Sequence, residues 1–227
     1  MHDVIVLCEG QTEREFCRSV VRPYIANQGV ALAGTLVGKP QRKRGGIRPW
    51  QVYRSELIRL AKERDGRILS VLVDYYAMPN CWPGRAKANS KPIDERGHYV
   101  ELELRKELAD VLGEQFIPCV QHHEFETLLF VNPELSALSI AVAGGTLSPK
   151  DVAAQMVEIR ESFDDKIERI NDSPQTAPSK RILELVPGYD KVAFGVTATT
   201  DVGVDELRSG CPWLDRWLTQ IEELGEG

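Results

Sequence analysis

Four carboxylates that stand where buried strands are predicted to end are the residues of this chain whose positions suggest chemistry. Each closely follows a short apolar run, and together they are Glu9, Asp74, Glu124 and Glu126. In open parallel sheets, ligands bind beyond the carboxyl ends of the strands, so we expect these acids to gather at one edge. Carboxylates held together repel one another, and a hard divalent cation relieves that repulsion. The pattern predicts a site for Mg²⁺ or Mn²⁺, and a basic loop beside such a site suggests metal-assisted phosphodiester chemistry.

The elements that must position these acids are strands that alternate with helices. Four apolar runs are typical of buried strands, and they span Asp3–Cys8, Val30–Val37, Ile68–Val73 and Phe116–Gln121. Helices are predicted over Trp50–Arg64 and Tyr99–Leu112, and a third begins near Thr12, which fits a capping box with Glu15. This alternation predicts an α/β fold with a mostly parallel, Rossmann-like sheet flanked by helices.

The character of the sequence changes after Asn132-Pro133. Helical segments then alternate with loops, and the predicted helices lie within Pro149–Ile170, Ser179–Leu185, Asp205–Arg208 and Trp213–Leu224. We therefore expect a metal-binding domain over residues 1–131. A mostly helical extension over residues 132–227 is expected to pack on that core.

Basic side chains are candidates for holding phosphate groups. The chain has a net charge of -6, yet residues 16–55 contain no acidic residue and eight Lys or Arg residues. A basic segment on an acidic protein attracts phosphates or an acidic partner surface, and the alternative is a solvated loop without a ligand. The candidates are Lys39, Arg42, Lys43 and Arg44 in this segment, Arg85 and Lys87 after Asp74, and Lys180 and Arg181 in the extension.

Two adjacent histidines, His122 and His123, follow the fourth predicted strand. Neighbouring side chains on a strand point to opposite faces, so at most one of them faces the acids. We favour His123 as a group that relays protons in the reaction. A zinc site is not indicated, because neither an i, i+4 pair of histidines nor a C-x-x-C pair accompanies them.

The acidic motifs resemble those of a Toprim domain, the metal-binding fold of topoisomerases, primases and nucleases of the OLD (overcoming lysogenisation defect) type. They read Glu9-Gly10-Gln11-Thr12-Glu13, Asp74-Tyr75-Tyr76 and His123-Glu124-Phe125-Glu126. More narrowly, their order is similar to that of a bacterial Toprim-like family of unknown function. Motifs of its C-terminal part are matched by Pro178-Ser179-Lys180-Arg181, Tyr189-Asp190-Lys191 and Cys211-Pro212-Trp213.

This resemblance implies roles for the acids and a partner for the chain. It implies acid/base or metal chemistry for Glu9 and Mg²⁺ binding for Asp74, with Glu124 and Glu126 completing the metal site. Members of the family are often encoded beside an AAA or ABC-type ATPase, in arrangements suggestive of phage defence. The implied function is a Mg²⁺-dependent nuclease that cuts DNA or RNA and is coupled to a separate ATPase subunit.

The sequence departs from the Toprim pattern at Tyr76, where the wider family commonly has the second Asp of Asp-x-Asp. A phenol with a pKa near ~10 is a poor Mg²⁺ ligand at neutral pH. A second hypothesis is therefore a catalytically silent, Toprim-derived subunit or adaptor docked on the ATPase. A third is a phosphotransfer or nucleotide-hydrolysing α/β domain, which would need a nucleotide-sized pocket at the acidic edge.

Other patterns exclude several classes of function. The chain contains no G-x-x-x-x-G-K-[ST], no G-x-G-x-x-G after a strand and no G-x-S-x-G, so neither its own P-loop ATPase nor a dinucleotide cofactor is predicted. The apolar runs are far shorter than a membrane span, and no signal segment precedes the first strand, so we expect a cytoplasmic protein. Five scattered cysteines suggest reduced thiols. The choice between monomer and homodimer stays open.

Overall fold

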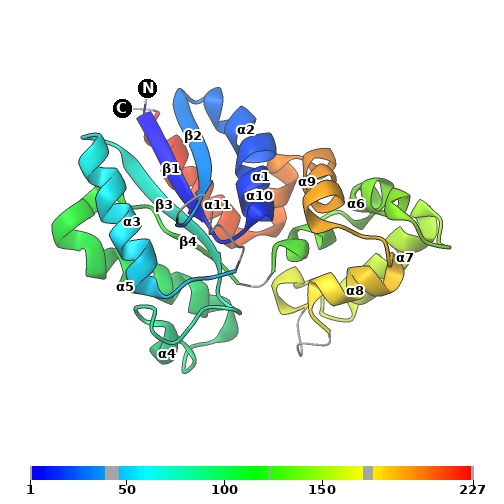
Figure 1. The fold of residues 1–227 in the computed structure, drawn as a ribbon. Coiled ribbons are helices and arrows are strands. Elements are labelled where there is room, and N and C mark those ends of the chain that lie inside the picture. The colour runs from blue at the N-terminus through cyan, green and yellow to red at the C-terminus, as the bar shows by residue number, and fades with distance from the viewer. Residues whose placement is uncertain (1, 39–45, 123, 171–175, 226–227) are drawn as a thin grey trace. The chain divides into compact units, whose positions relative to one another are not determined.

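The computed structural model describes residues 2–38, 46–122, 124–170 and 176–225. Its contacts divide the chain into two compact units (Figure 1). The sheet unit comprises Met1–His122 and Trp213–Gly227, and the helical unit comprises His123–Pro212. The boundary expected between residues 131 and 132 stays a prediction, because contact-defined units need not be domains that fold independently.

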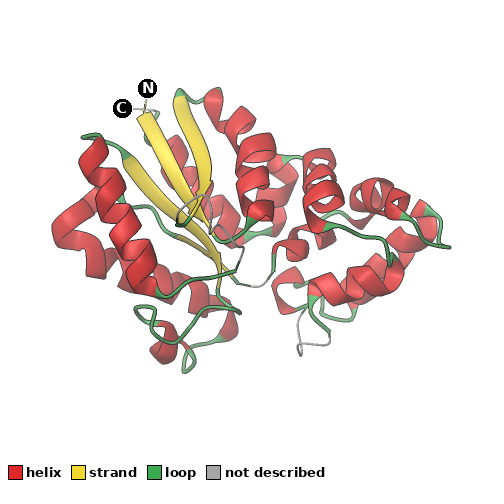
Figure 2. Cartoon of the chain, in the orientation of Figure 1, coloured by secondary structure: helices red, strands yellow, loops and turns green. Residues whose placement is uncertain are grey.

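The sheet unit is built on four parallel strands in the order β2-β1-β3-β4 (Figure 2). Their bounds are β1 (His2–Cys8), β2 (Val30–Leu36), β3 (Ile68–Asp74) and β4 (Cys119–Gln121). The central strands β1 and β3 are rich in Val, Ile and Leu because both faces of the sheet are covered, as in other all-parallel sheets. The predicted parallel α/β architecture is confirmed.

The fourth strand is shorter than predicted. Phe116 keeps an isolated parallel bridge to Leu69, but β4 itself begins only at Cys119. Pro118 lies between them and has no N–H to donate to the ladder, which explains the interruption.

Helices cover both faces of this sheet. They are α1 (Gln11–Phe16), α2 (Arg22–Ala26), α3 (Trp50–Glu63), α4 (Arg85–Ala88), α5 (Arg96–Leu112) and α11 (Pro212–Glu222). On one face, α3 and α5 pack on a core that includes Tyr53, Val71 and Leu104. On the other face, Trp217 of α11 donates its indole N–H to the Ser70 hydroxyl over 3.0 Å. The C-terminal helix is thus anchored to a central strand.

The first helix starts two residues earlier than the predicted capping box places it. Helix α1 begins at Gln11, and the carboxylate of Glu13 accepts the Gly10 N–H over 2.8 Å. The Thr12/Glu15 capping box is therefore wrong by two residues. A Cβ on Gly10 would lie only 2.9 Å from Glu13 Oε2, so glycine lets this carboxylate close over the turn.

The helical unit confirms the expected helical character of the C-terminal part. Its α-helices are α6 (Pro133–Ile140), α7 (Pro149–Glu161), α8 (Pro178–Leu185), α9 (Val196–Val202) and α10 (Val204–Gly210). A 3₁₀ segment, Phe125–Phe130, supplies buried apolar side chains to its core. Within the described ranges of the chain, no helix is both long and apolar enough to cross a bilayer.

Candidate functional site

Glu9 and Asp74 meet at the carboxyl edge of the sheet. The parallel register pairs Cys8 with Leu72, and the Glu9 N–H donates to the Leu72 carbonyl over 3.1 Å. Glu9 directly follows β1 and Asp74 is the last residue of β3, and Glu9 Oε2 accepts the backbone N–H of Asp74 over 3.0 Å. Parallel pairing of β1 and β3 therefore brings together two acids that are far apart in the sequence.

Gln121 holds the Asp74 carboxylate from the other side. It ends β4, is almost fully buried, and its side-chain amide donates to Asp74 Oδ1. Its backbone carbonyl accepts the Tyr75 N–H over 2.8 Å. Three strand ends thus contribute one side chain each to the site. Gln121 was missed in the sequence, although its place at the end of a predicted strand was the available signal.

A stack of side chains lies directly after Asp74. The guanidinium carbon of Arg85 lies 4.1 Å from the centre of the Tyr75 ring, and Arg85 Nη1 donates to the Tyr75 hydroxyl over 3.0 Å. The ring of His122 is parallel to that of Tyr75, with 5.9 Å between the ring centroids. The predicted phosphate ligand Arg85 is therefore attached to the residue that follows Asp74.

Two buried side chains near Glu9, Tyr53 and Cys8, have raised pKa values. Burial, and then the nearby charge of Glu9, raise the pKa of Tyr53 above its ordinary range, so this phenol stays protonated. Burial likewise raises the pKa of Cys8, next to Glu9, which keeps the thiol neutral. Neither group supplies an anionic nucleophile at neutral pH.

Tyr76, at the position of the missing second Asp, is 44% exposed, whereas Tyr75 is buried. Lys87, in α4, is exposed as well.

Glu124 and Glu126 belong to the helical unit. Glu124 Oε2 accepts the Ser179 N–H over 3.0 Å in the first turn of α8, a favourable place for a carboxylate. Glu126 is fully buried. Burial, followed by the charge of Glu126, raises the pKa of Tyr189. The structure thus places these two acids with Tyr189, and a joint site of all four acids stays a prediction.

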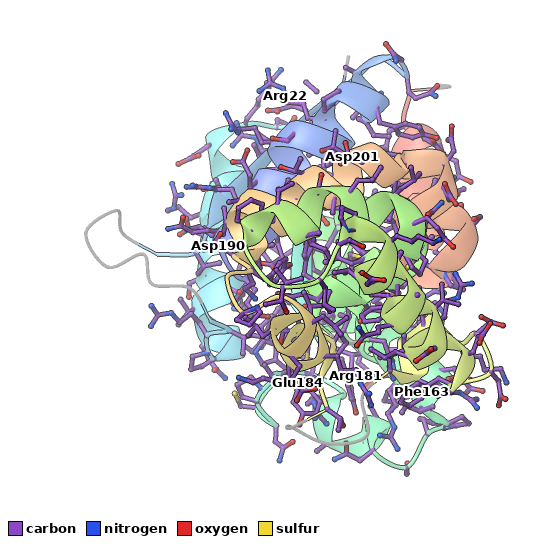
Figure 3. The ribbon with its side chains drawn as sticks, turned by 90° about the vertical axis from the view of Figure 1, so that its right-hand side faces the viewer. Arg22, Phe163, Arg181, Glu184, Asp190 and Asp201 are labelled. Carbon is purple, nitrogen blue, oxygen red and sulfur yellow. The ribbon has the colours of Figure 1, made fainter. Side chains whose placement is uncertain are left out.

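The basic candidates of the helical unit are arranged around the start of α8. Arg181 Nε donates to the Thr176 carbonyl over 2.8 Å, and its guanidinium lies 5.1 Å from the centre of the Phe163 ring (Figure 3). Lys180 is exposed. The predictions for His123, Lys39, Arg42, Lys43 and Arg44 lie outside the described residues.

The fold and site define an α/β protein with a parallel sheet, a pair of acids at its carboxyl edge and a second, helical unit. The chain belongs to the family described as "Domain of unknown function (DUF4276)", which matches residues 8–222. The motif order led us to expect a family of unknown function, and the roles of the motifs themselves stay predictions.

Comparison with solved structures and curated proteins adds two findings. The chain is similar to the C-terminal region of the Burkholderia pseudomallei OLD protein, with 15% sequence identity, a TM-score of 0.48 and coverage of 98% of both chains. No curated protein matches the chain significantly.

Proposed function

We propose that this chain is a Mg²⁺- or Mn²⁺-dependent phosphodiester hydrolase that cuts DNA or RNA. The observation that carries the proposal is the hydrogen bond from the Asp74 N–H to Glu9 Oε2, which places the Glu9 carboxylate against the backbone of Asp74 at the ligand-binding edge of a parallel sheet. The Toprim-like motifs around these two residues support the same assignment.

The donor set of this edge fits magnesium. Glu9 and Asp74 offer hard oxygen ligands, and each is oriented by an N–H donor, from the Asp74 backbone and from Gln121. Over the part of the chain that is described, no three His, Cys, Asp or Glu side chains are grouped so that they could hold a metal ion. Mg²⁺ does not need such a cage, because it is usually bound by one or two carboxylates, with waters and substrate phosphates completing its shell.

Different residues of the chain would bind the metal ion, transfer a proton and bind the phosphate. Asp74 and Glu9 would bind the ion, and the Glu9 carboxylate would also accept or donate a proton. Arg85, fixed on Tyr75, would offer positive charge to a phosphate near Asp74. When bound, Mg²⁺ supplies Lewis-acid polarisation of the phosphate and lowers the pKa of a bound water. Glu124, Glu126 and His123 remain proposed contributors from the other part of the chain.

A separate ATPase partner belongs to the same proposal. Its support is the resemblance to proteins encoded beside ATPases, together with the lack of a P-loop motif in this sequence. Coupling to such a partner would place the nuclease in a defence system against phage. ATP hydrolysis would then come from another polypeptide.

Cleavage of labelled single-stranded and duplex DNA and RNA by the purified chain tests the proposal, with Mg²⁺ or Mn²⁺ and with EDTA as the blank. The variants Glu9→Gln and Asp74→Asn should cut at least about 100-fold more slowly, since metal-ion catalysis contributes several kcal/mol. Asp3→Asn is the matched control, because Asp3 lies at the start of β1 and pairs with Arg64 and Arg67.

Two results would overturn the proposal. If both edge variants cut as fast as the parent, these acids are not the catalytic centre. If the parent neither cuts nor binds Mg²⁺, alone or with a co-purified ATPase, the silent-subunit hypothesis holds. The exposed Tyr76 at the second acid position is the observation that favours this alternative.

A further inference from the structure

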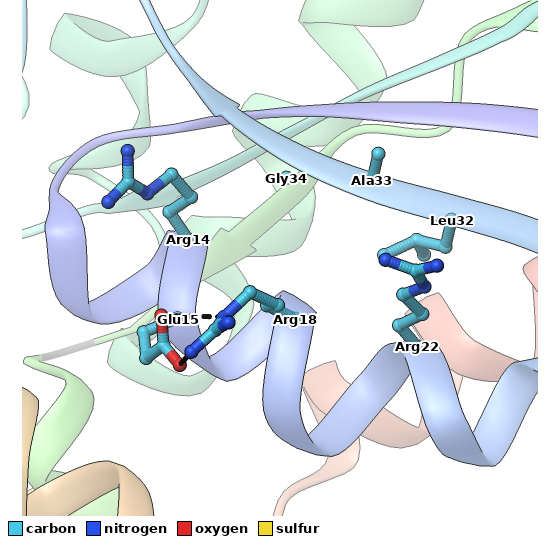
Figure 4. Close-up of a pocket in the computed structure, with 7 residues that line it drawn as sticks. All are labelled: Arg14, Glu15, Arg18, Arg22, Leu32, Ala33 and Gly34. Atoms are coloured by element: carbon cyan, nitrogen blue, oxygen red, sulfur yellow. Dashed lines mark hydrogen bonds and ion pairs between the residues drawn. The ribbon is translucent and has the colours of Figure 1, made fainter.

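A pocket of about 430 Å³ lies in the sheet unit beside the edge strand β2 (Figure 4). Its lining comes from the α1–α2 region and from the middle of β2, and consists of Arg14, Glu15, Arg18, Arg22, Leu32, Ala33 and Gly34. Neither Glu9 nor Asp74 is among these residues, so the pocket is separate from the acidic pair. Its volume falls within the range of small-molecule sites, about 300–1,000 Å³.

Three arginines, spaced four residues apart, form one wall. Arg14 is in α1, Arg22 begins α2, and Arg18 lies in the π-helical turn Cys17–Val21 that joins them. In a regular α-helix, eight residues advance about 80° beyond two full turns, so Arg14 and Arg22 would diverge. A π-turn winds more slowly, with i→i+5 hydrogen bonds, and brings the two ends back toward one face. Such turns are frequent at functional sites.

The charge of this wall is mostly uncompensated. Arg18 is held by the one carboxylate of the pocket, with Arg18 Nε 2.9 Å from Glu15 Oε1 (Figure 4). The Arg18 hydrogen bonds, and then that from Ser19, lower the pKa of Glu15, which therefore stays ionised at neutral pH. Within the described residues, the guanidinium groups of Arg14 and Arg22 form no ion pair. The pocket carries a net charge of about two positive units.

The strand side of the pocket is apolar and consists of Leu32, Ala33 and Gly34. Gly34 lets the helix lie close to the strand, because a Cβ there would be 2.9 Å from the Cβ of Cys17 and 3.2 Å from Cys8 Sγ. The lining contains no aromatic ring. The pocket therefore offers cationic hydrogen-bond donors and space, without a surface for stacking bases.

We propose that this arginine pocket binds the phosphodiester backbone of a single nucleic-acid strand. Guanidinium groups form paired hydrogen bonds with phosphate oxygens, and such contacts do not depend on sequence. Eight residues of helix span about 12 Å, so Arg14 and Arg22 together address more than one phosphate. The inference extends the proposed nuclease function by naming a second contact for its substrate, but binding here does not require cleavage.

The test is the affinity of a fluorescent single-stranded oligonucleotide for the full chain in EDTA, measured by anisotropy at several salt concentrations. The double variant Arg14→Gln/Arg22→Gln should bind at least about tenfold more weakly. Its salt slope should fall by about 1.4, because each single-strand phosphate contact contributes about 0.7. Glu15→Gln, which releases Arg18, should bind more tightly than the parent.

The matched control is Arg54→Gln/Arg59→Gln, which removes the same charge from α3, where these arginines pair with Glu107 and Glu56. It should change affinity less than twofold. Equal losses in both double variants, or unchanged binding by Arg14→Gln/Arg22→Gln, would overturn the proposal. So would equally tight binding of a mononucleotide or inorganic phosphate, since the site would then serve a small phosphate ligand.

Failure of this inference and failure of the proposed function are distinguishable. The EDTA assay is independent of metal chemistry, so it reports strand binding whether or not Glu9 and Asp74 hold a metal ion. A chain that binds the strand through Arg14 and Arg22 but never cuts it would retain the pocket and lose the nuclease assignment. A chain that still cuts and binds the strand without Arg14 and Arg22 would retain the nuclease assignment and lose the proposed role of the pocket.

Discussion

Glu9 and Asp74 are 65 residues apart in the sequence, yet Glu9 Oε2 accepts the backbone N–H of Asp74 over 3.0 Å. This contact follows from the parallel pairing of β1 with β3, which ends both strands at the same edge. It fixes the orientation of the Glu9 carboxylate without using the Asp74 side chain. The Asp74 carboxylate is fixed in turn by Gln121 of the neighbouring strand.

Gln121 should control metal affinity without binding the metal. Gln121→Met keeps the length of the side chain but removes the amide that donates to Asp74, and loss of a partner that orients a ligand typically weakens metal binding by about 10–100-fold. Titration with Mn²⁺ measures this effect. Gln51→Met, an exposed position on α3, is the control. Unchanged Mn²⁺ affinity in Gln121→Met would argue against Asp74 as a ligand.

Glu101 should stabilise the edge strand β4. Its buried carboxylate accepts the Val120 N–H over 2.9 Å, and lies 3.1 Å from His98 Nδ1. Glu101→Ala leaves a buried N–H of β4 without its acceptor, which costs about 1–3 kcal/mol in the free energy of unfolding. Urea denaturation measures this loss. The exposed pair of Glu107 with Arg54 gives the control variant Glu107→Ala, for which a change below about 0.5 kcal/mol is expected. Similar losses in both variants would contradict this role.

Gly34 should be required for close packing of the helix on β2. Gly34→Ala places a Cβ 2.9 Å from the Cβ of Cys17, and overpacking of this kind typically costs about 1–3 kcal/mol. Thermal or urea unfolding measures the cost, and oligonucleotide affinity reports any narrowing of the arginine pocket. Gly145→Ala is the comparison, since its nearest neighbour atom would be 3.7 Å away. A neutral Gly34→Ala would mean that the helix can move away from the strand freely.

The capping box of α7 should give part of the helical unit an acid-sensitive stability. The Ser148 hydroxyl, and then the Ser148 N–H, lower the pKa of Asp151. A lowered pKa in the folded state stabilises the protein above the unfolded carboxyl pKa, about 3.9, and this stabilisation is lost as the pH falls through the folded pKa. In Ser148→Ala, an NMR titration should show the Asp151 pKa moving upward. Its stability deficit should be larger at pH 7 than at pH 2, and a deficit independent of pH would contradict this explanation.

The sheet and the pairing of Glu9 with Asp74 were predictable because both follow from local patterns. Apolar runs identify the strands, and parallel strands place their carboxyl ends at one edge. Gln121 was missed because an amide at a strand end has no chemical signature of its own in the sequence. The same patterns could not show that β4 ends at Gln121 and that the helical unit starts at His123, so that Glu124 and Glu126 belong to the helical unit.

Two other features depend on structure that the sequence does not display. The arginine pocket requires the π-helical turn at Cys17–Val21, and a regular helix would have been predicted there. Likewise, the sequence does not display the contact by which Trp217 of α11 donates to Ser70 of β3. Long-range contacts of this kind are set by packing and not by local propensity.

Calorimetric titration of the chain with Mn²⁺ and Mg²⁺ tests the central claim most directly. The parent should bind in the micromolar to millimolar range, and Glu9→Gln/Asp74→Asn should show no binding heat. The glutamine oxygen can still accept the Asp74 N–H, so this edge of the sheet should stay intact. Asp3→Asn should bind like the parent. Undiminished binding by the double variant, or no binding by the parent, would contradict a metal site formed by Glu9 and Asp74.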